Sequence, residues 1–369
     1  MKIVLGGAVV VLSVGAICQT SAQPVYTATE WNGRQVVQLG GLPGTLYSYP
    51  SYAKAINNAD QIIGESVSSN GYHAVEWSGG QIHDLGDLPG NTRRYYWAEA
   101  INTAGQVVGE SSTANGLRAV EWSSGQITDL GGLPGYTENS ASGINDLGQV
   151  VGASGNGPGP YYAVEWSHGQ AVDLGGLPGS PISYAEAINT AGQVVGGSQI
   201  AGVDHAVEWS GGQIRDLGVL PLRGYTDSVA YDINAAGQVV GLSCDIANDN
   251  CHGVEWINGN IRDLGALPGN LYSRANAIND AGQIVGESCV DIAGNDSCHA
   301  VEWSDGQIID LGGLPDLIGP VSSVAEGINA EGQSVGSSLT GIPELSTWSM
   351  TLLSVAGFGW AAYRRDRHA

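Results

Sequence analysis

The sequence predicts an all-β chain, a seven-bladed β-propeller built from four-stranded repeats of about 45 residues. The phrase INxxGQ is the first observation behind this prediction, because it begins seven times at spacings of 43 to 50 residues: Ile56, Ile101, Ile144, Ile188, Ile233, Ile278 and Ile328. The dipeptide Glu-Trp also occurs seven times, in step with that phrase. The motif DLGxLP occurs six times in the same order, and Gln38 takes the Asp place in the remaining copy.

Each repeat carries four short segments, which read xAxAIN, QVVGES, HAVEW and QIxDLG. Segments rich in Val and Ile and bounded by Gly, Asn and Ser are typical of strands. INxxG has the composition of a turn, with Asn at the first position and Gly where the backbone becomes left-handed. Asp60 replaces that Gly in the first copy and tolerates the same conformation. The phrase is therefore interpreted as a hairpin corner rather than a binding motif.

The two ends of the repeat region are incomplete in a complementary way. The first copy begins midway through a repeat, and the last copy stops after two segments. Pairing residues 324–338 with residues 25–40 completes a seventh blade and removes the free sheet edges. An open β-solenoid is the alternative architecture, although its coils need no mixed closing unit.

Three regions divide the chain: a signal peptide (1–22), the propeller (23–340) and a C-terminal tail (341–369). Lys2, an apolar run over Ile3–Ile17 and the small residues before Ala22 are typical of an export signal. A short membrane anchor is less favoured, because this run is shorter than the roughly 20 residues that span a bilayer.

The composition is strongly acidic, with 36 Asp and Glu against 13 Lys and Arg and a formal net charge of −23. Such a surface repels phosphate groups, so we expect no nucleic-acid partner. The loops at 245–250 and 291–296 contain Asp and Asn, which could supply oxygen ligands to calcium, but they lack the full EF-hand pattern. No other cofactor is expected.

Four cysteines of the repeat region fall in two close pairs, Cys244 with Cys251 and Cys289 with Cys298. An exported protein meets oxidising conditions, so each pair is predicted to form a disulfide that closes its own loop. A zinc site that includes His252 and His299 is the alternative, and it requires the two loops to converge.

The order HAVEWSxGQIxDLGxLPG, followed by AINxxGQVVGES, resembles the HAF repeat of bacterial extracellular proteins over residues 26–338. This chain differs in placing Val-Glu where that repeat usually has Phe-Leu. The resemblance implies an exported repeat protein, and it implies no particular activity.

The last residues are similar to a PEP-CTERM sorting signal. Pro343 and Glu344 begin the match, an apolar run covers Trp348–Tyr363, and Arg364 and Arg365 follow. The resemblance implies recognition and cleavage by an exosortase-like enzyme, a transient membrane anchor, and release to the surface of a Gram-negative-type bacterium, often alongside exopolysaccharide. Leu345 replaces the second Pro of the motif. A plain C-terminal anchor is the alternative.

Catalytic residues are not predicted, because the obvious acids recur in every repeat and chemistry usually needs an asymmetric pair. The Asp of DLG is interpreted as a turn residue, the Trp of Glu-Trp as packing between blades, and its Glu as solvent-facing.

Ligand-binding residues are predicted on the connections that vary between repeats, because function concentrates on loops that a rigid scaffold carries. These candidates share aromatic or guanidinium side chains that could stack on sugars: Tyr47, Arg93, Arg94, Tyr95, Tyr96, Trp97, Tyr136 and Tyr225. The alternative is that the tyrosines only cover the ends of the blades.

The sequence as a whole favours a secreted or cell-surface protein of the extracellular matrix with a non-catalytic binding or scaffold role. Exopolysaccharide or another matrix component is the expected ligand. A glycan-active enzyme, hydrolase or lyase, and a purely structural surface protein are the alternatives.

Overall fold

The computed structural model describes residues 25–340, apart from 34, 43–49, 91–94, 158, 168, 223, 246–249, 291–296 and 315–321. The predicted signal peptide and sorting tail lie outside the described residues. Pro24–Ile342 forms one compact unit. Within the described part of the chain, no helix is long and apolar enough to cross a membrane.

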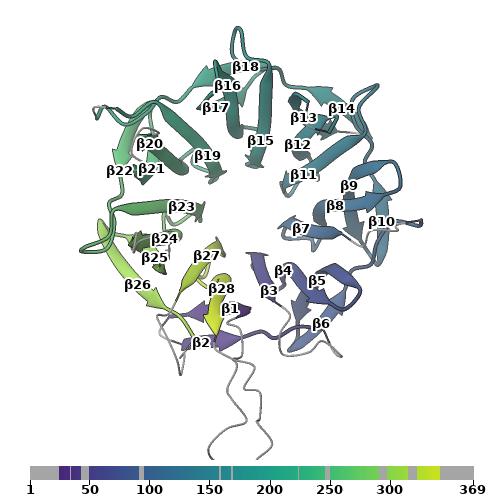
Figure 1. The fold of residues 1–369 in the computed structure, drawn as a ribbon, viewed down its shortest axis with the longest axis horizontal. Helices are drawn as coiled ribbons and strands as arrows, with labels where there is room; N and C mark the ends of the chain where they lie inside the picture. The colour runs from purple at the N-terminus through teal and green to yellow at the C-terminus, as the bar shows by residue number, and fades with distance from the viewer. Residues whose placement is uncertain are drawn as a thin grey trace, which may run out of the picture. The chain divides into compact units, whose positions relative to one another are not determined.

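Seven antiparallel four-stranded sheets form a closed ring, as Figure 1 shows. Blades 1 to 3 comprise β3 (Ser51–Ile56), β4 (Ile62–Ser68), β5 (Gly71–Ser78) and β6 (Gln81–Asp84); β7 (Tyr96–Ile101), β8 (Val107–Thr113), β9 (Gly116–Ser123) and β10 (Gln126–Asp129); and β11 (Glu138–Ile144), β12 (Val150–Gly155), β13 (Tyr161–Ser167) and β14 (Gln170–Asp173). Blades 4 to 6 comprise β15 (Ile182–Ile188), β16 (Val194–Ile200), β17 (Val203–Ser210) and β18 (Gln213–Asp216); β19 (Asp227–Ile233), β20 (Val239–Asp245), β21 (Asn250–Ile257) and β22 (Asn260–Asp263); and β23 (Tyr272–Ile278), β24 (Ile284–Val290), β25 (Ser297–Ser304) and β26 (Gln307–Gly312). The predicted seven-bladed propeller is confirmed.

Blade 7 joins the two ends of the repeat region. It comprises β27 (Ser323–Ile328), β28 (Ser334–Thr340), β1 (Val25–Asn32) and β2 (Gln35–Gln38), in the spatial order β2-β1-β28-β27. The strands β1 and β28 pair antiparallel from Val25↔Thr340 to Trp31↔Ser334. The mixed closing blade predicted from the incomplete terminal repeats is therefore present.

The core consists of seven apolar clusters, and each lies between neighbouring blades. In one of them, Ile63 and Ala74 of blade 1 pack with Val107 and Trp122 of blade 2. The Trp of each Glu-Trp pair also donates its indole N–H to a glycine carbonyl of the preceding blade's DLG segment, at 2.9 to 3.3 Å. The expectation that these tryptophans pack between blades is confirmed by these contacts.

The INxxG corners join the first two strands of every blade. Asn102 accepts main-chain N–H bonds from Ala104 and Gln106, and Gly105 has a φ of 77°. Asp60 takes the same left-handed conformation in the first copy, with a φ of 58°. The predicted turn chemistry is confirmed, and the structure adds a second use of the asparagine. Its side-chain amide donates to the main-chain oxygen of the asparagine in the next blade.

The glutamate of each Glu-Trp pair does not simply face solvent, which corrects the expectation from sequence. The corner asparagine donates to the Gln four residues later at 2.5 to 2.9 Å. That Gln donates in turn to the glutamate of its own blade at 2.8 to 3.4 Å. Glu208 and Glu255 are buried and also pair with Arg215 and Arg262. Hydrogen bonding supplies the partners that a buried carboxylate requires.

Candidate functional site

The first strand of each blade lines a central channel, and a β-bulge in that strand turns one variable side chain toward the axis. The register shifts lie between the residues that flank this position, for example between Ala53 and Ala55. The seven bulged residues are Lys54, Glu99, Ser142, Glu186, Tyr231, Asn276 and Glu326. All of them line a cavity of about 400 Å³, the channel cavity.

Ion pairs link the charged residues of the channel. The Lys54 ammonium lies 3.6 Å from Glu99 and 3.7 Å from Glu326. Glu326 and Glu99 raise the pKa of Lys54 above its usual range, so the ammonium stays charged. Arg274 similarly lies 3.2 Å from Glu287 and 3.7 Å from Glu326. Burial raises the pKa of Glu186 to about 7.

A second cavity, of about 440 Å³, opens beside Lys54 where the first strands of blades 1 and 2 begin. We name it the acidic cavity, and its walls include Tyr52, Glu65, Trp97, Glu99 and Glu110. Burial raises the pKa of Glu65 to about 7, and burial with nearby Glu99 raises the pKa of Glu110 to about 8. One carboxylate oxygen of Glu65 is buried without a hydrogen-bond partner among the described residues. Both groups can therefore exchange a proton near neutral pH.

Three aromatic rings form the wall of a third cavity, the aromatic cavity, of about 520 Å³. Tyr72 and Tyr95 stack at 5.3 Å, and Trp97 lies 6.4 Å from Tyr72 and 6.1 Å from Tyr95. Tyr95 is 42% exposed. Because Trp97 also lines the acidic cavity, the aromatic surface and the carboxylates adjoin at this end of the channel.

The predicted ligand residues do not form one group. Tyr95 and Trp97 lie together, whereas Tyr96 is buried on the opposite side of the same segment. Tyr136 packs against Tyr162 at 5.3 Å, and Tyr225 contacts His252 at 5.8 Å. Tyr47, Arg93 and Arg94 lie outside the described residues.

Four residues of the two cavities were not predicted from the sequence: Tyr72, Glu65, Glu99 and Glu110. Glu99 occupies the variable position between two alanines of xAxAIN, and a comparison of the seven copies would have found it. Tyr72 precedes the histidine of HAVEW, and Tyr26 and Tyr161 stand at the same place in two other repeats, so this position gave no distinct signal. Glu65 and Glu110 gave no comparable signal, because the glutamate of QVVGES recurs in several repeats.

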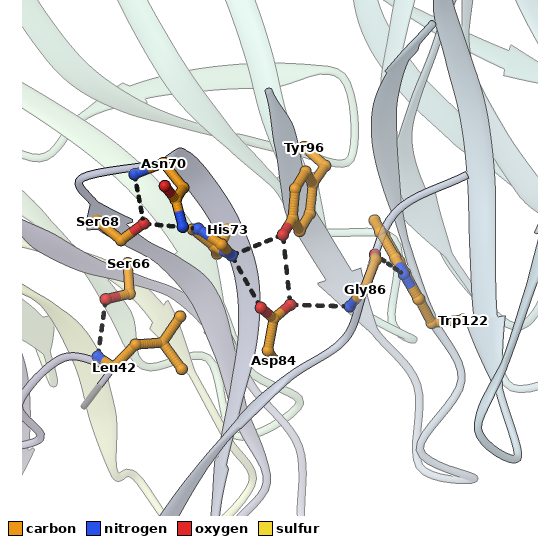
Figure 2. Close-up of polar contacts among 9 residues, drawn as sticks. All are labelled: Leu42, Ser66, Ser68, Asn70, His73, Asp84, Gly86, Tyr96 and Trp122. Carbon is orange, nitrogen blue, oxygen red and sulfur yellow. Dashed lines mark hydrogen bonds and ion pairs between the residues drawn. The ribbon is translucent and has the colours of Figure 1, made fainter. Parts of the chain in front are cut away.

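A polar network beside the aromatic cavity centres on His73, as Figure 2 shows. His73 Nδ1 lies 2.8 Å from Asp84 and 2.6 Å from the Tyr96 hydroxyl, and its Nε2 lies 2.8 Å from Ser68 Oγ. Ser68, His73 and Asp84 are connected through hydrogen bonds in the same order as the catalytic triad of a serine hydrolase. However, the same His–Asp contact recurs in blades 4, 5 and 6, at 2.7 to 3.0 Å. It is therefore a feature of the repeat that fastens the third strand to the DLG turn.

The DLG aspartates themselves hold turns, as the sequence predicted. Asp84 Oδ1 accepts the main-chain N–H of Gly86 at 2.9 Å, and five other repeats make the same bond. A main-chain N–H also donates to a side chain of blade 1: the N–H of Leu42, which follows β2, donates to Ser66 Oγ at 3.0 Å.

Both predicted disulfides are present, Cys244–Cys251 and Cys289–Cys298. Such bonds are typical of proteins outside the cytoplasm. Glu287 lies within 4.8 Å of the sulfurs of Cys289 and Cys298. Among the described residues, this is the one cluster with the composition of a metal site. Those sulfurs are bonded to each other, so they are not free to bind a metal. Most of the two Asp-containing loops considered for calcium lies outside the described residues.

No protein-family model matches the chain, and no curated protein matches it. Among solved structures, it is similar to a puromycin-hydrolyzing peptidase of Mycobacterium tuberculosis, with 12% identity, a TM-score of 0.52, and coverage of 83% of this chain and 56% of that one. A puromycin hydrolase matches with 13% identity, a TM-score of 0.47, and coverage of 82% and 52%. TolB from Acinetobacter baumannii matches with 10% identity, a TM-score of 0.46, and coverage of 80% and 64%.

This chain spans less than two thirds of the length of each of these proteins. At 12% identity, the likeness to the peptidase shows the propeller fold alone. That fold is compatible with both enzymatic and binding roles.

Proposed function

We propose that this chain is an exported surface or matrix protein whose propeller binds polysaccharide without chemical change. The observation that carries the proposal is the junction of the aromatic and acidic cavities at Trp97. Sugar rings have an apolar face that packs on aromatic side chains, and their hydroxyl groups donate to carboxylates. A site with apolar walls and a few polar groups is typical of ligand pockets. The stacked rings of Tyr72 and Tyr95 supply such a wall.

A titration of the full chain with the exopolysaccharide of the host tests this proposal. We expect saturable binding that Trp97→Ala and Tyr95→Ala each weaken about tenfold, a loss typical of one aromatic contact. Tyr136→Ala is the matched control, because Tyr136 lies in blade 3's connection and contacts Tyr162 instead. Absence of saturable binding would contradict the proposal and leave a purely structural surface protein. Equal losses in all three variants would place the site elsewhere.

A glycan hydrolase or lyase is the second candidate, and the raised pKa values of Glu65 and Glu110 favour it. A carboxyl group that holds its proton near pH 7 can act as a general acid beside an ionised partner. The test is a screen for shortened or unsaturated glycan products with the wild-type chain and Glu110→Gln. If the wild-type chain forms such products and Glu110→Gln does not, the role is catalytic rather than binding alone.

Export and sorting complete the proposal. The apolar segment Ile3–Ile17, the two disulfides and the resemblance of the tail to an exosortase signal support delivery to the cell surface. Mass spectrometry of the chain recovered from the host's surface tests both ends. We expect an N-terminus near residue 23 and a C-terminus near Pro343. A surface chain that retains Arg364 and Arg365 would favour the plain anchor.

A further inference from the structure

The acidic cavity contains more carboxyl groups than cations. Its ionisable walls are Glu65, Glu99, Glu110 and Glu326 together with one cation, Lys54. The Lys54 ammonium is already shared by Glu99 and Glu326, at 3.6 and 3.7 Å. Glu65 and Glu110 form no salt bridge with any described residue. Two half-buried carboxyl groups therefore line this space without an ion-pair partner of their own.

Aromatic side chains also make the cavity favourable for a cation. Tyr52 and Trp97 border the same space as these carboxyls. The face of an aromatic ring is electronegative and attracts ammonium groups, most strongly when water is excluded. Burial raises the pKa of Glu65, and the Trp97 indole lies close enough to lower it in part, which places the ring beside that carboxyl. Tyr52 stays uncharged, since burial raises the pKa of its hydroxyl to about 12.

The charge of the site discriminates between classes of sugar. An anionic sugar would add repulsion to a cavity that is already acidic. A neutral sugar could donate a hydroxyl group to the unpaired oxygen of Glu65, but it would bring no positive charge to the carboxyl groups of the cavity. An ammonium group supplies both the missing charge and three N–H donors.

We propose that the ligand of this site is a cationic amino sugar, a hexosamine unit with a free ammonium group. The ammonium lies in the acidic cavity against Glu65 and Glu110, and the sugar ring and its neighbours extend over Trp97 into the aromatic cavity. The aromatic cavity, of about 520 Å³, gives room for the neighbouring rings. This inference rests on the proposed polysaccharide-binding function and names the class of its ligand.

A comparison of two matched oligosaccharides tests the inference with the full chain at neutral pH. One probe is a tetrasaccharide of glucosamine, and the other is the same tetrasaccharide fully N-acetylated, which carries no charge. We expect the amine form to bind at least about tenfold more tightly, as for a desolvated charge-assisted contact. Glu65→Gln and Glu110→Gln are expected to reduce this preference, because they keep the shape of the side chain and remove a carboxyl group that can ionise beside the ammonium.

The matched control is Glu331→Gln, which removes the same charge from an exposed residue in the corner between β27 and β28. It should leave both affinities unchanged. Equal affinity for the two probes, or a preference untouched by Glu65→Gln and Glu110→Gln, would overturn the inference while the polysaccharide-binding function stands. Failure of both probes and of the host's exopolysaccharide to bind would overturn the function as well.

Discussion

The side-chain amide of Asn57 donates to the main-chain oxygen of Asn102, 45 residues further along the chain, at 3.1 Å. Every blade repeats this bond to the next, and Asn329 closes the circle by donating to Asn57 at 3.4 Å. The seven bonds, of 2.9 to 3.4 Å, surround one end of the channel. The corner phrase is therefore both a turn and the connection between neighbouring blades.

Substitution of one corner asparagine should destabilise the whole ring. Asn189 is buried, accepts bonds from Ala191 and Gln193, and donates to Gln193 and to the oxygen of Asn234. We expect Asn189→Ala to lower the free energy of unfolding by about 2 to 4 kcal/mol, because several buried groups lose partners. Denaturant unfolding measures the change. Thr190→Ala, at the exposed neighbouring position, should cost far less; a similar cost for the two variants would contradict the role given to Asn189.

Removal of the closing strands should abolish cooperative unfolding. Deletion of residues 323–340 removes β27 and β28 and exposes the long edge of β1 that now pairs with β28. An exposed edge of this kind favours aggregation. We expect loss of the single thermal transition and rapid proteolysis, and analytical ultracentrifugation should detect oligomers. A monomeric, protease-resistant product would mean that the ring does not depend on this closure.

The stability of the protein should fall as the pH rises from 5 to 8, because of Glu65 and Glu110. Below pH 4.5 both carboxyls are protonated in the folded and unfolded chains. Above it the unfolded carboxyls ionise, whereas the folded ones keep their protons until about pH 7 and 8. The stabilisation present at low pH is thus lost by pH 8, at roughly 1 to 3 kcal/mol for each group.

The double variant Glu65→Gln, Glu110→Gln isolates this effect. Its melting temperature should depend less on pH than that of the wild type, and it should exceed the wild-type value at pH 8. Calorimetry across the pH range measures both. Glu331→Gln, an exposed control, should keep the wild-type slope. An unchanged slope in the double variant would show that these carboxyls ionise normally.

The two disulfides should each stabilise the fold by constraining the unfolded chain. Cys244 and Cys251 are separated by 7 positions and Cys289 and Cys298 by 9. Loops of this size correspond to about 2 to 3 kcal/mol of loop-closure entropy. We expect Cys289→Ser with Cys298→Ser to lower the free energy of unfolding by that amount, and a reductant to have no further effect once the second pair is also replaced. An unchanged free energy of unfolding would show that these bonds do not stabilise the fold.

Much of the fold could be predicted from the sequence because every element occurs about seven times. The corner at Ile101–Gly105 repeats the composition of the other corners, so turn chemistry identified it. The glutamate of Glu-Trp was assigned wrongly, because its partner lies in the corner before another strand of the blade. Gln106 donates to Glu121 across 15 residues. A local pattern contains no information about such a pairing.

The candidate site could be predicted only in part. Tyr95 and Trp97 were found as unusual aromatic residues, but Tyr96 was grouped with them although side chains alternate along extended chain. That alternation sends Tyr96 into the interior, where it meets His73 and Asp84. The acidic cavity depends on the approach of blades 1 and 2, which place Glu65 and Glu110 at one space. No pattern within a single repeat specifies that arrangement.

The central claim is that the ligand occupies the space between the aromatic ring of Trp97 and the carboxyls of Glu65 and Glu110. Hydroxyl-radical footprinting of the full chain, with and without saturating glucosamine tetrasaccharide, tests it most directly. The account predicts protection of Tyr72, Tyr95 and Trp97, with no change at Tyr136. Protection confined to Tyr136, or unchanged labelling of Trp97 at saturation, would contradict it.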